Sequence, residues 1–169
     1  MRHGRELAGS ITGFLMFLSA ALCAQESGGM PAMGATPGMT AYRPPAESLR
    51  TAEQVTRYLR TVAEGATPNL DGLDLTHLDF RGVDFRRATL IGTRLQSAQL
   101  DSANLFSCDL TDARASGASF IGANMDVSTL RRADLRGANL RTASLFATIL
   151  EAADLREADL RETRIIGFL

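Results

Sequence analysis

The side chains best suited to chemistry are few and scattered in this sequence of 169 residues. Beyond the first 24 residues it holds one histidine, His77, and one cysteine, Cys108. Paired carboxylates such as Asp154 and Asp159 have the chemistry of general acids and bases, but they recur with a short repeat and have no evident partner. No Gly-rich phosphate loop and no cluster of metal-ligating residues stands out. We therefore expect no catalytic residue, no metal site and no cofactor, and we expect Cys108 to be a buried packing residue.

A five-residue pattern runs from Pro68 to the C-terminus, through twenty repeats without an insertion. The central residue is Leu in fourteen repeats, and a small residue usually stands two places before it. This period fits neither an α-helix, which turns by about 100° per residue, nor a strand, whose side chains alternate. The chain must therefore change direction about once per repeat. Two inward positions of different size would fill a narrow interior without voids.

Segments such as ADLRG (133–137), ANLRT (138–142) and ADLRE (153–157) resemble the pentapeptide-repeat family, whose motif is A(D/N)LXX. The resemblance covers residues 68–169. It implies an all-β solenoid, a right-handed quadrilateral β-helix in which four repeats make one turn and twenty make about five coils. At a spacing of about 4.8 Å per coil, such a β-helix would be roughly 24 Å long.

Four repeats per turn would stack residues that are twenty apart. One outward column then contains Phe106, Phe146 and Ile166. Apolar side chains that gather on one side of a solenoid are typical of a protein-contact surface. We predict such a surface here, together with Phe168 and Leu169 near the C-terminus.

Arginines gather in neighbouring columns, where they could contact an anionic polymer. The predicted anion-contact residues are Arg131, Arg136, Arg141, Arg156 and Arg161. Acidic residues are interleaved with them, so a solvated surface whose charges pair with one another is the competing interpretation.

The resemblance also implies a family activity, the inhibition or protection of DNA gyrase by mimicry of duplex DNA. Such mimicry needs a dense negative surface. Residues 68–169 hold fourteen acidic residues against twelve arginines, which is close to balance. We therefore do not favour this activity and expect no binding of nucleic acid.

The first 24 residues are typical of a bacterial secretory signal peptide. Basic residues precede an apolar run, 11–22, that is shorter than the roughly 20 residues of a membrane span. Cleavage is expected after Ala24, with Ala21 as an alternative site and lipidation at Cys23 as a rival. The protein is then exported, periplasmic or secreted, and keeps no membrane span once the signal is removed.

Three further segments are predicted after the signal peptide. Residues 25–46 are rich in Gly, Pro and Met without periodicity and indicate a flexible linker. Residues 47–65 space apolar side chains by three and four, and Thr51 with Gln54 forms a capping box. These features predict an amphipathic helix that caps the N-terminal end of the β-helix, residues 66–169.

The C-terminal sequence RIIGFL offers no comparable cap. Either this tail folds over the last coil or a second subunit covers it. Pairing through the C-terminal coil occurs in related proteins, so the resemblance implies a homodimer as one of the two arrangements.

These observations favour an exported, non-enzymatic structural or protein-interaction module that presents rigid faces to an unidentified protein partner in the cell envelope. The alternative is a binder of an anionic envelope polymer or of a metal through Arg or Met side chains. Met30, Met33 and Met39 carry thioethers that suit Cu(I), although no His or Cys stands beside them, and a spacer is the better interpretation.

Overall fold

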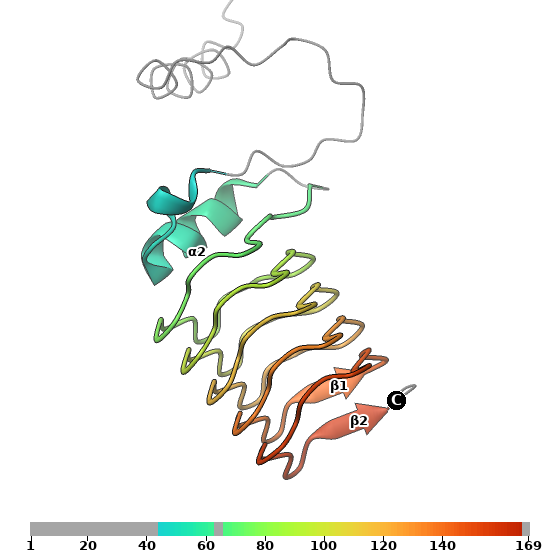
Figure 1. Ribbon diagram of the computed structural model, residues 1–169. Helices are drawn as coiled ribbons and strands as arrows, with labels where there is room; N and C mark the ends of the chain where they lie inside the picture. Colours follow the sequence, from blue (N-terminus) through green and yellow to red (C-terminus); the bar gives the residue numbers. More distant parts are fainter. Residues whose placement is uncertain (1–43, 63–65, 167–169) are drawn as a thin grey trace, which may run out of the picture. The chain divides into compact units, whose positions relative to one another are not determined.

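The structure, a computed structural model, describes residues 44–62 and 66–166 (Figure 1). Its regular elements are the short 3₁₀-helix η1 (Ala46–Ser48), the α-helix α2 (Ala52–Thr61), and the strands β1 (Ser144–Phe146) and β2 (Arg164–Ile166). Most of the described chain forms a stack of turns instead. The predicted signal peptide and nearly all of the predicted linker lie outside the described residues.

Helix α2 begins at the predicted capping box. The Gln54 N–H donates to Thr51 Oγ1 at 3.3 Å, and the Thr51 N–H donates to Gln54 Oε1 at 3.0 Å. The helix is shorter than the predicted segment 47–65, because Thr51 takes the N-cap position and separates α2 from η1. Val62 leaves the helical conformation at the other end.

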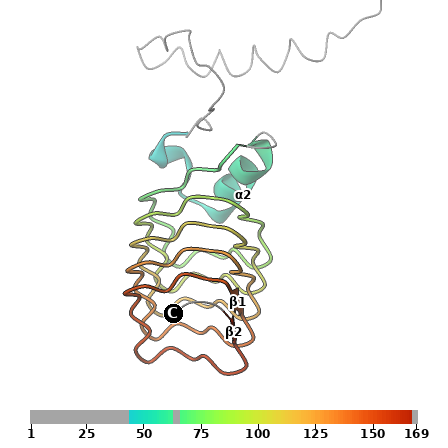
Figure 2. The ribbon, with the colours of Figure 1, turned by 90° about the vertical axis from the view of Figure 1, so that its right-hand side faces the viewer.

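Parallel backbone bridges join residues that are twenty apart, beginning with Asn69 opposite Thr89. Strands β1 and β2 follow the same register, with Phe146 opposite Ile166. Four such ladders run along the stack, so one turn contains four repeats, in agreement with the predicted stacking. Figures 1 and 2 show the turns stacked between α2 and β2. We call residues 69–88 the first turn.

Each repeat makes two kinds of ladder hydrogen bond and one sharp bend. The Leu90 N–H donates to the carbonyl of Asp109 at 2.7 Å, and the Asp109 N–H donates back to the carbonyl of Ala88 at 3.1 Å. The residue two places after the central one has a positive φ, between 53° and 66°. Glycine adopts this conformation freely at Gly82, whereas the β-branched Val127, at φ 59°, is strained there.

The predicted inward positions form the core. Central side chains from Leu70 to Leu145 are at most 2% exposed, and the Phe80 and Phe85 rings meet edge-on with centroids 5.3 Å apart. The buried Cys108 thiol donates to the Phe85 carbonyl at 3.1 Å, and burial raises its pKa to about 12. Cys108 is therefore a packing residue, as expected.

Helix α2 packs its apolar face onto the first turn. Val55 is fully buried and belongs to the same core cluster as Leu70. Tyr58 is buried beside it, and its hydroxyl oxygen accepts the Asn69 N–H at 3.1 Å. The predicted apolar face did not include Tyr58, because its polar tip obscures a ring that packs as a hydrophobe.

Candidate functional site

The predicted apolar column lies on the outer surface of the stack. Phe106 is 40% exposed, Phe146 50% and Ile166 57%. The register of β1 and β2 places Phe146 beside Ile166, whereas Asp126 separates Phe106 from Phe146 in the column. The structure therefore places Phe146 and Ile166 in adjacent turns, whereas Phe106 lies two turns from Phe146.

Two more exposed apolar side chains extend this column around the adjoining corner. The Val127 N–H donates to the carbonyl of Phe146 at 2.8 Å, and Ile149 follows Phe146 by three residues. Val127 is 49% exposed and Ile149 39%. Sequence reasoning missed both, although each replaces a polar residue at an outward position of the repeat.

We call these five residues the apolar stripe: Phe106, Val127, Phe146, Ile149 and Ile166. Phe168 and Leu169, which were predicted to belong to the same surface, lie outside the described residues.

The carboxylate within the stripe has a structural role. Asp126 Oδ1 accepts the Phe146 N–H at 2.8 Å and the Ser144 hydroxyl at 2.6 Å. In most repeats an Asp or Asn two places earlier accepts this N–H, as Asn104 does from Phe106 at 3.2 Å. Ser144 stands at that place in β1, so the carboxylate one turn earlier takes over. The same arrangement occurs at two other exposed side chains. Asp71 Oδ1 accepts the Ile91 N–H at 2.9 Å, and Asp101 Oδ1 accepts the Ile121 N–H at 3.1 Å.

Val127 combines exposure with backbone strain. A left-handed conformation disfavours β-branched residues, and the equivalent residues one turn away are Ser107 and Ala147. The Val127 side chain is half in solvent, so core packing does not compensate for the strain. Folding alone therefore does not favour valine at this place.

All five predicted anion-contact arginines, which we call the arginine surface, form ion pairs. Their partners are Glu151 for Arg131 (3.1 Å), Asp134 and Asp154 for Arg136 (2.8 and 3.7 Å), Glu162 for Arg141 (3.8 Å), Asp154 for Arg156 (2.6 Å) and Asp159 for Arg161 (2.6 Å). Three of the five arginines, Arg136, Arg156 and Arg161, pair within their own repeat, since an Asp two residues before an Arg projects from the same side of the repeat.

These pairs shift the titration of their carboxylates. Hydrogen bonds from the Arg156 guanidinium hold the pKa of Asp154 at about 2, and those from Arg161 do the same for Asp159. The pairs are solvent-exposed and each contributes little to stability. The arginine surface thus neutralises much of its own charge, whereas no apolar group covers the stripe within the described residues.

Other kinds of site find no support in the part of the chain that the structure describes. Within 44–62 and 66–166, no three His, Cys, Asp or Glu side chains are grouped so that they could hold a metal ion. No helix in those ranges has the length and apolarity to span a membrane. The three methionines considered for copper, Met30, Met33 and Met39, lie outside the described residues.

Comparison with known families gives one match. The family model for pentapeptide repeats matches residues 69–105 and 108–145, with eight copies of its unit. Among curated proteins, none matched this sequence.

Several solved structures are similar. A pentapeptide repeat protein from the thylakoid lumen of Arabidopsis thaliana is 27% identical over 56% of this chain and 65% of its own, with a TM-score of 0.54. A pentapeptide repeat protein from Nostoc PCC 7120 is 33% identical over 51% of this chain and 76% of its own, with a TM-score of 0.45. QnrB1, a plasmid-mediated fluoroquinolone resistance protein, is 16% identical over 59% and 61%, with a TM-score of 0.52, which shows the fold alone. The chain spans less than two thirds of the Arabidopsis protein and of QnrB1.

Proposed function

This chain belongs to the pentapeptide-repeat family, and from that premise we propose that it is an exported, non-enzymatic module whose apolar stripe binds a protein partner in the cell envelope. Proteins of this family fold as right-handed quadrilateral β-helices and are generally structural or interaction proteins rather than enzymes. The observation that carries the proposal is the stripe, five exposed apolar side chains along one edge of a regular surface.

The dimensions and composition of the stripe suit a protein contact. Three turns separate Phe106 from Ile166, which is about 14 Å at a strand spacing of about 4.8 Å. Full burial of one large apolar side chain contributes about 1.5–3 kcal/mol, and aromatic residues are frequent at the centre of protein interfaces. The two phenylalanines are therefore the expected anchors.

The arginine surface is a weaker candidate. An anionic polymer bound there would have to compete with the carboxylates that already pair with each of its five arginines. The same pairing disfavours mimicry of DNA, since carboxylates that pair with arginines do not present the dense negative surface that mimicry needs.

The finer architecture belongs to the proposal. We propose that twenty repeats complete five coils and that α2 caps the first of them, with Tyr58 in place of a missing strand. Leu155 and Leu160 in the last turn are only half-buried, and Ile165 is 40% exposed. We propose that a second copy covers them. Light scattering coupled to size exclusion tests this arrangement, and a strict monomer would contradict it.

Export rests on the sequence of the first 24 residues. A C-terminally tagged full chain is expected in the envelope or the medium, shortened by a mass that corresponds to cleavage after Ala24. A full-length protein that remains in the cytoplasm would overturn both the export and the proposed location of the partner.

Capture from an envelope fraction tests the contact itself. We expect the wild type to retain a partner at low and high salt, because apolar contact is weakly screened. The double variant Phe106→Ser, Phe146→Ser should lose it. The matched control is Ile91→Ser, Ile121→Ser, which removes two side chains that are 38% exposed outside the stripe and should retain it.

Two outcomes would contradict the proposal. Loss of the partner at high salt in the wild type would indicate charge-dominated binding. Equal retention by the stripe variant and the control would show that the stripe is not the contact.

A further inference from the structure

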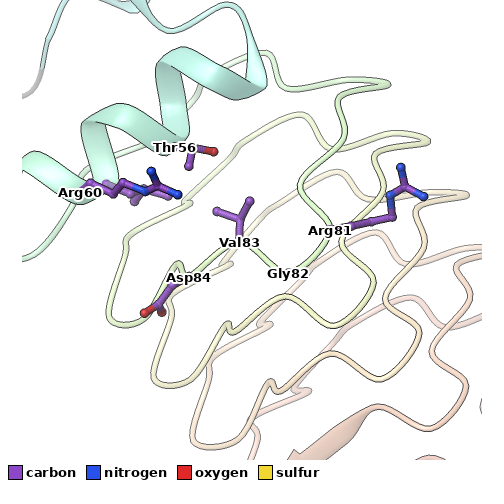
Figure 3. A pocket seen from close by; sticks show the side chains of 7 residues that line it. Thr56, Arg60, Arg81, Gly82, Val83 and Asp84 are labelled. Carbon is purple, nitrogen blue, oxygen red and sulfur yellow. The ribbon is translucent and has the colours of Figure 1, made fainter.

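Helix α2 and the first turn enclose a groove of about 390 Å³. The helix contributes Thr56, Leu59 and Arg60, and the first turn contributes residues 81–84. Figure 3 shows the Val83 side chain directed towards the helix, between Gly82 and Asp84. We call this hollow the edge groove.

The floor of the edge groove is an open backbone edge. In the second turn, the Asn104 N–H donates to the carbonyl of Val83 in the turn before it, at 2.9 Å. Within 44–62 and 66–166, the equivalent N–H of Asp84 has no partner. At another point of the same edge, the Tyr58 hydroxyl replaces the missing turn by accepting the Asn69 N–H. Among the described residues, α2 thus satisfies one part of the edge and supplies no partner to the N–H of Asp84.

A carbonyl on the same edge is open as well. The Gly82 N–H donates to the carbonyl of Asp101 in the next turn, at 2.9 Å, and Arg81 occupies the position of Asp101 in the first turn. No donor reaches the Arg81 carbonyl from the described residues. One donor and one acceptor, three residues apart, therefore face the groove side of the first turn. A chain segment that bends as the first turn does at Gly82, where φ is 66°, can pair with both groups through its own backbone.

The walls of the groove add an apolar surface and a cation. Leu59 and Val83 are half-buried, and both line the groove. Arg60 has no carboxylate partner among the described residues, and Figure 3 places it on the helix side of the groove. Arg81 does not compete for a ligand, because Asp79 holds it at 2.6 Å and its side chain is directed away.

We propose that the edge groove binds a short segment of a partner protein that follows the bend of the first turn and carries a carboxylate. The segment adds a strand to the first turn through the Asp84 N–H and the Arg81 carbonyl. An apolar side chain of the segment packs between Leu59 and Val83, and its carboxylate pairs with Arg60. This site is independent of the apolar stripe and does not rest on the function proposed above.

The direct test uses the full chain and the tetrapeptide Thr-Val-Thr-Asp with an N-terminal fluorescein. Fluorescence anisotropy measures its binding, and amide NMR locates it. We expect saturable binding, shifts of the amides of residues 81–84, and slower hydrogen exchange at the Asp84 amide, since that N–H becomes hydrogen-bonded. The same peptide with N-methylated backbone amides keeps its side chains, loses its donors and should bind at least about tenfold more weakly.

Two variants separate the carboxylate contact from general charge. Arg60→Gln should weaken binding of the tetrapeptide about tenfold, because it removes a charge-assisted hydrogen bond. Arg50→Gln removes the charge of an exposed arginine that precedes α2 and does not line the groove, and binding should stay within twofold.

Three results would overturn the proposal. They are no saturation by millimolar peptide, equal binding of the N-methylated peptide, and amide shifts confined to the apolar stripe. The first would show that the edge groove has no affinity for a short acidic segment. The second would exclude strand addition, and the third would place the peptide elsewhere.

Discussion

The apolar stripe and the arginine surface are both exposed departures from the same repeat, yet they differ in what the fold does with them. Each arginine of the arginine surface has a carboxylate within 3.8 Å or less, supplied by its own repeat or by an adjacent turn. The side chains of the stripe are 39% to 57% exposed, with no covering group in 44–62 and 66–166.

The contrast shows where binding capacity lies on a repetitive surface. An ion-paired arginine must leave its partner before it can bind an external anion, so much of the gain is lost. An exposed phenylalanine gives up only water when a partner covers it. We infer that a regular surface of this kind binds through the groups that the repeat leaves unsatisfied.

The largest expected effect comes from a charge placed in the stripe. Phe146→Asp should reduce capture of the envelope partner at least about thirtyfold, since it removes a central anchor and buries an unpaired carboxylate. Capture titrated against bait concentration measures this. Arg156→Gln, on the arginine surface, should change capture less than twofold. Comparable losses for the two variants would remove the distinction between the surfaces.

The carboxylate beneath the stripe should matter for stability rather than for binding. Asp126→Ala leaves the Phe146 N–H and the Ser144 hydroxyl without their acceptor and should lower the free energy of unfolding by about 1–2 kcal/mol. Urea denaturation followed by circular dichroism checks this value. Asp126→Asn keeps an acceptor oxygen and should restore most of the loss, whereas equal losses would assign the effect to charge.

Replacement of Val127 is expected to raise the stability of the fold and to weaken binding of the partner. Val127→Gly relieves a left-handed conformation and should raise the free energy of unfolding by about 0.5–1 kcal/mol, while capture of the partner weakens several-fold. Thermal unfolding and capture of the same sample measure both quantities.

The reciprocal variant is Gly82→Val. No atom lies within 4 Å of a Cβ added at Gly82, so the variant introduces strain without a clash and should destabilise the fold by about 1 kcal/mol. If Val127→Gly were less stable than the wild type, the assigned strain would be wrong.

The smallest effect is expected from acid. Ion pairing lowers the folded-state pKa of Asp154 and Asp159 to about 2, below the ordinary value near 3.8. The stabilisation is therefore fully present above about pH 4 and is lost as the pH falls towards 2. Hydrogen exchange at the Arg156 amide, which donates to Asp154, should accelerate in that interval. Exchange at the Phe106 amide, which donates to the neutral Asn104, should change in that interval only as the intrinsic exchange rate of an amide changes with pH.

The period of the sequence predicts the core and the stacking, because both depend on one repeated choice of inward residue. It also predicts Phe106, Phe146 and Ile166 as one column. It does not predict Val127 and Ile149 as part of the same surface, because their proximity depends on how the chain bends at a corner. Tyr58 was missed for a related reason, since the hydrogen bond that satisfies its hydroxyl joins the helix to a residue eleven positions away.

The arginine surface illustrates a limit of a different kind. Pairs such as Asp154 with Arg156 are visible as a two-residue spacing. The pairing of Arg131 with Glu151 requires the twenty-residue turn, and that of Arg141 with Glu162 departs from it by one position. Charge balance along the sequence therefore indicated self-pairing but did not identify the partners.

The most direct test of the central claim is site-specific photo-crosslinking in the producing cells. A benzophenone side chain replaces Phe146 in one sample of the full chain and Arg156 in another, and the crosslinked products are identified by mass spectrometry. We predict one recurrent envelope protein at position 146 and no recurrent product at position 156. The same product at both positions, or a product at 156 alone, would contradict the assignment of the apolar stripe as the contact surface.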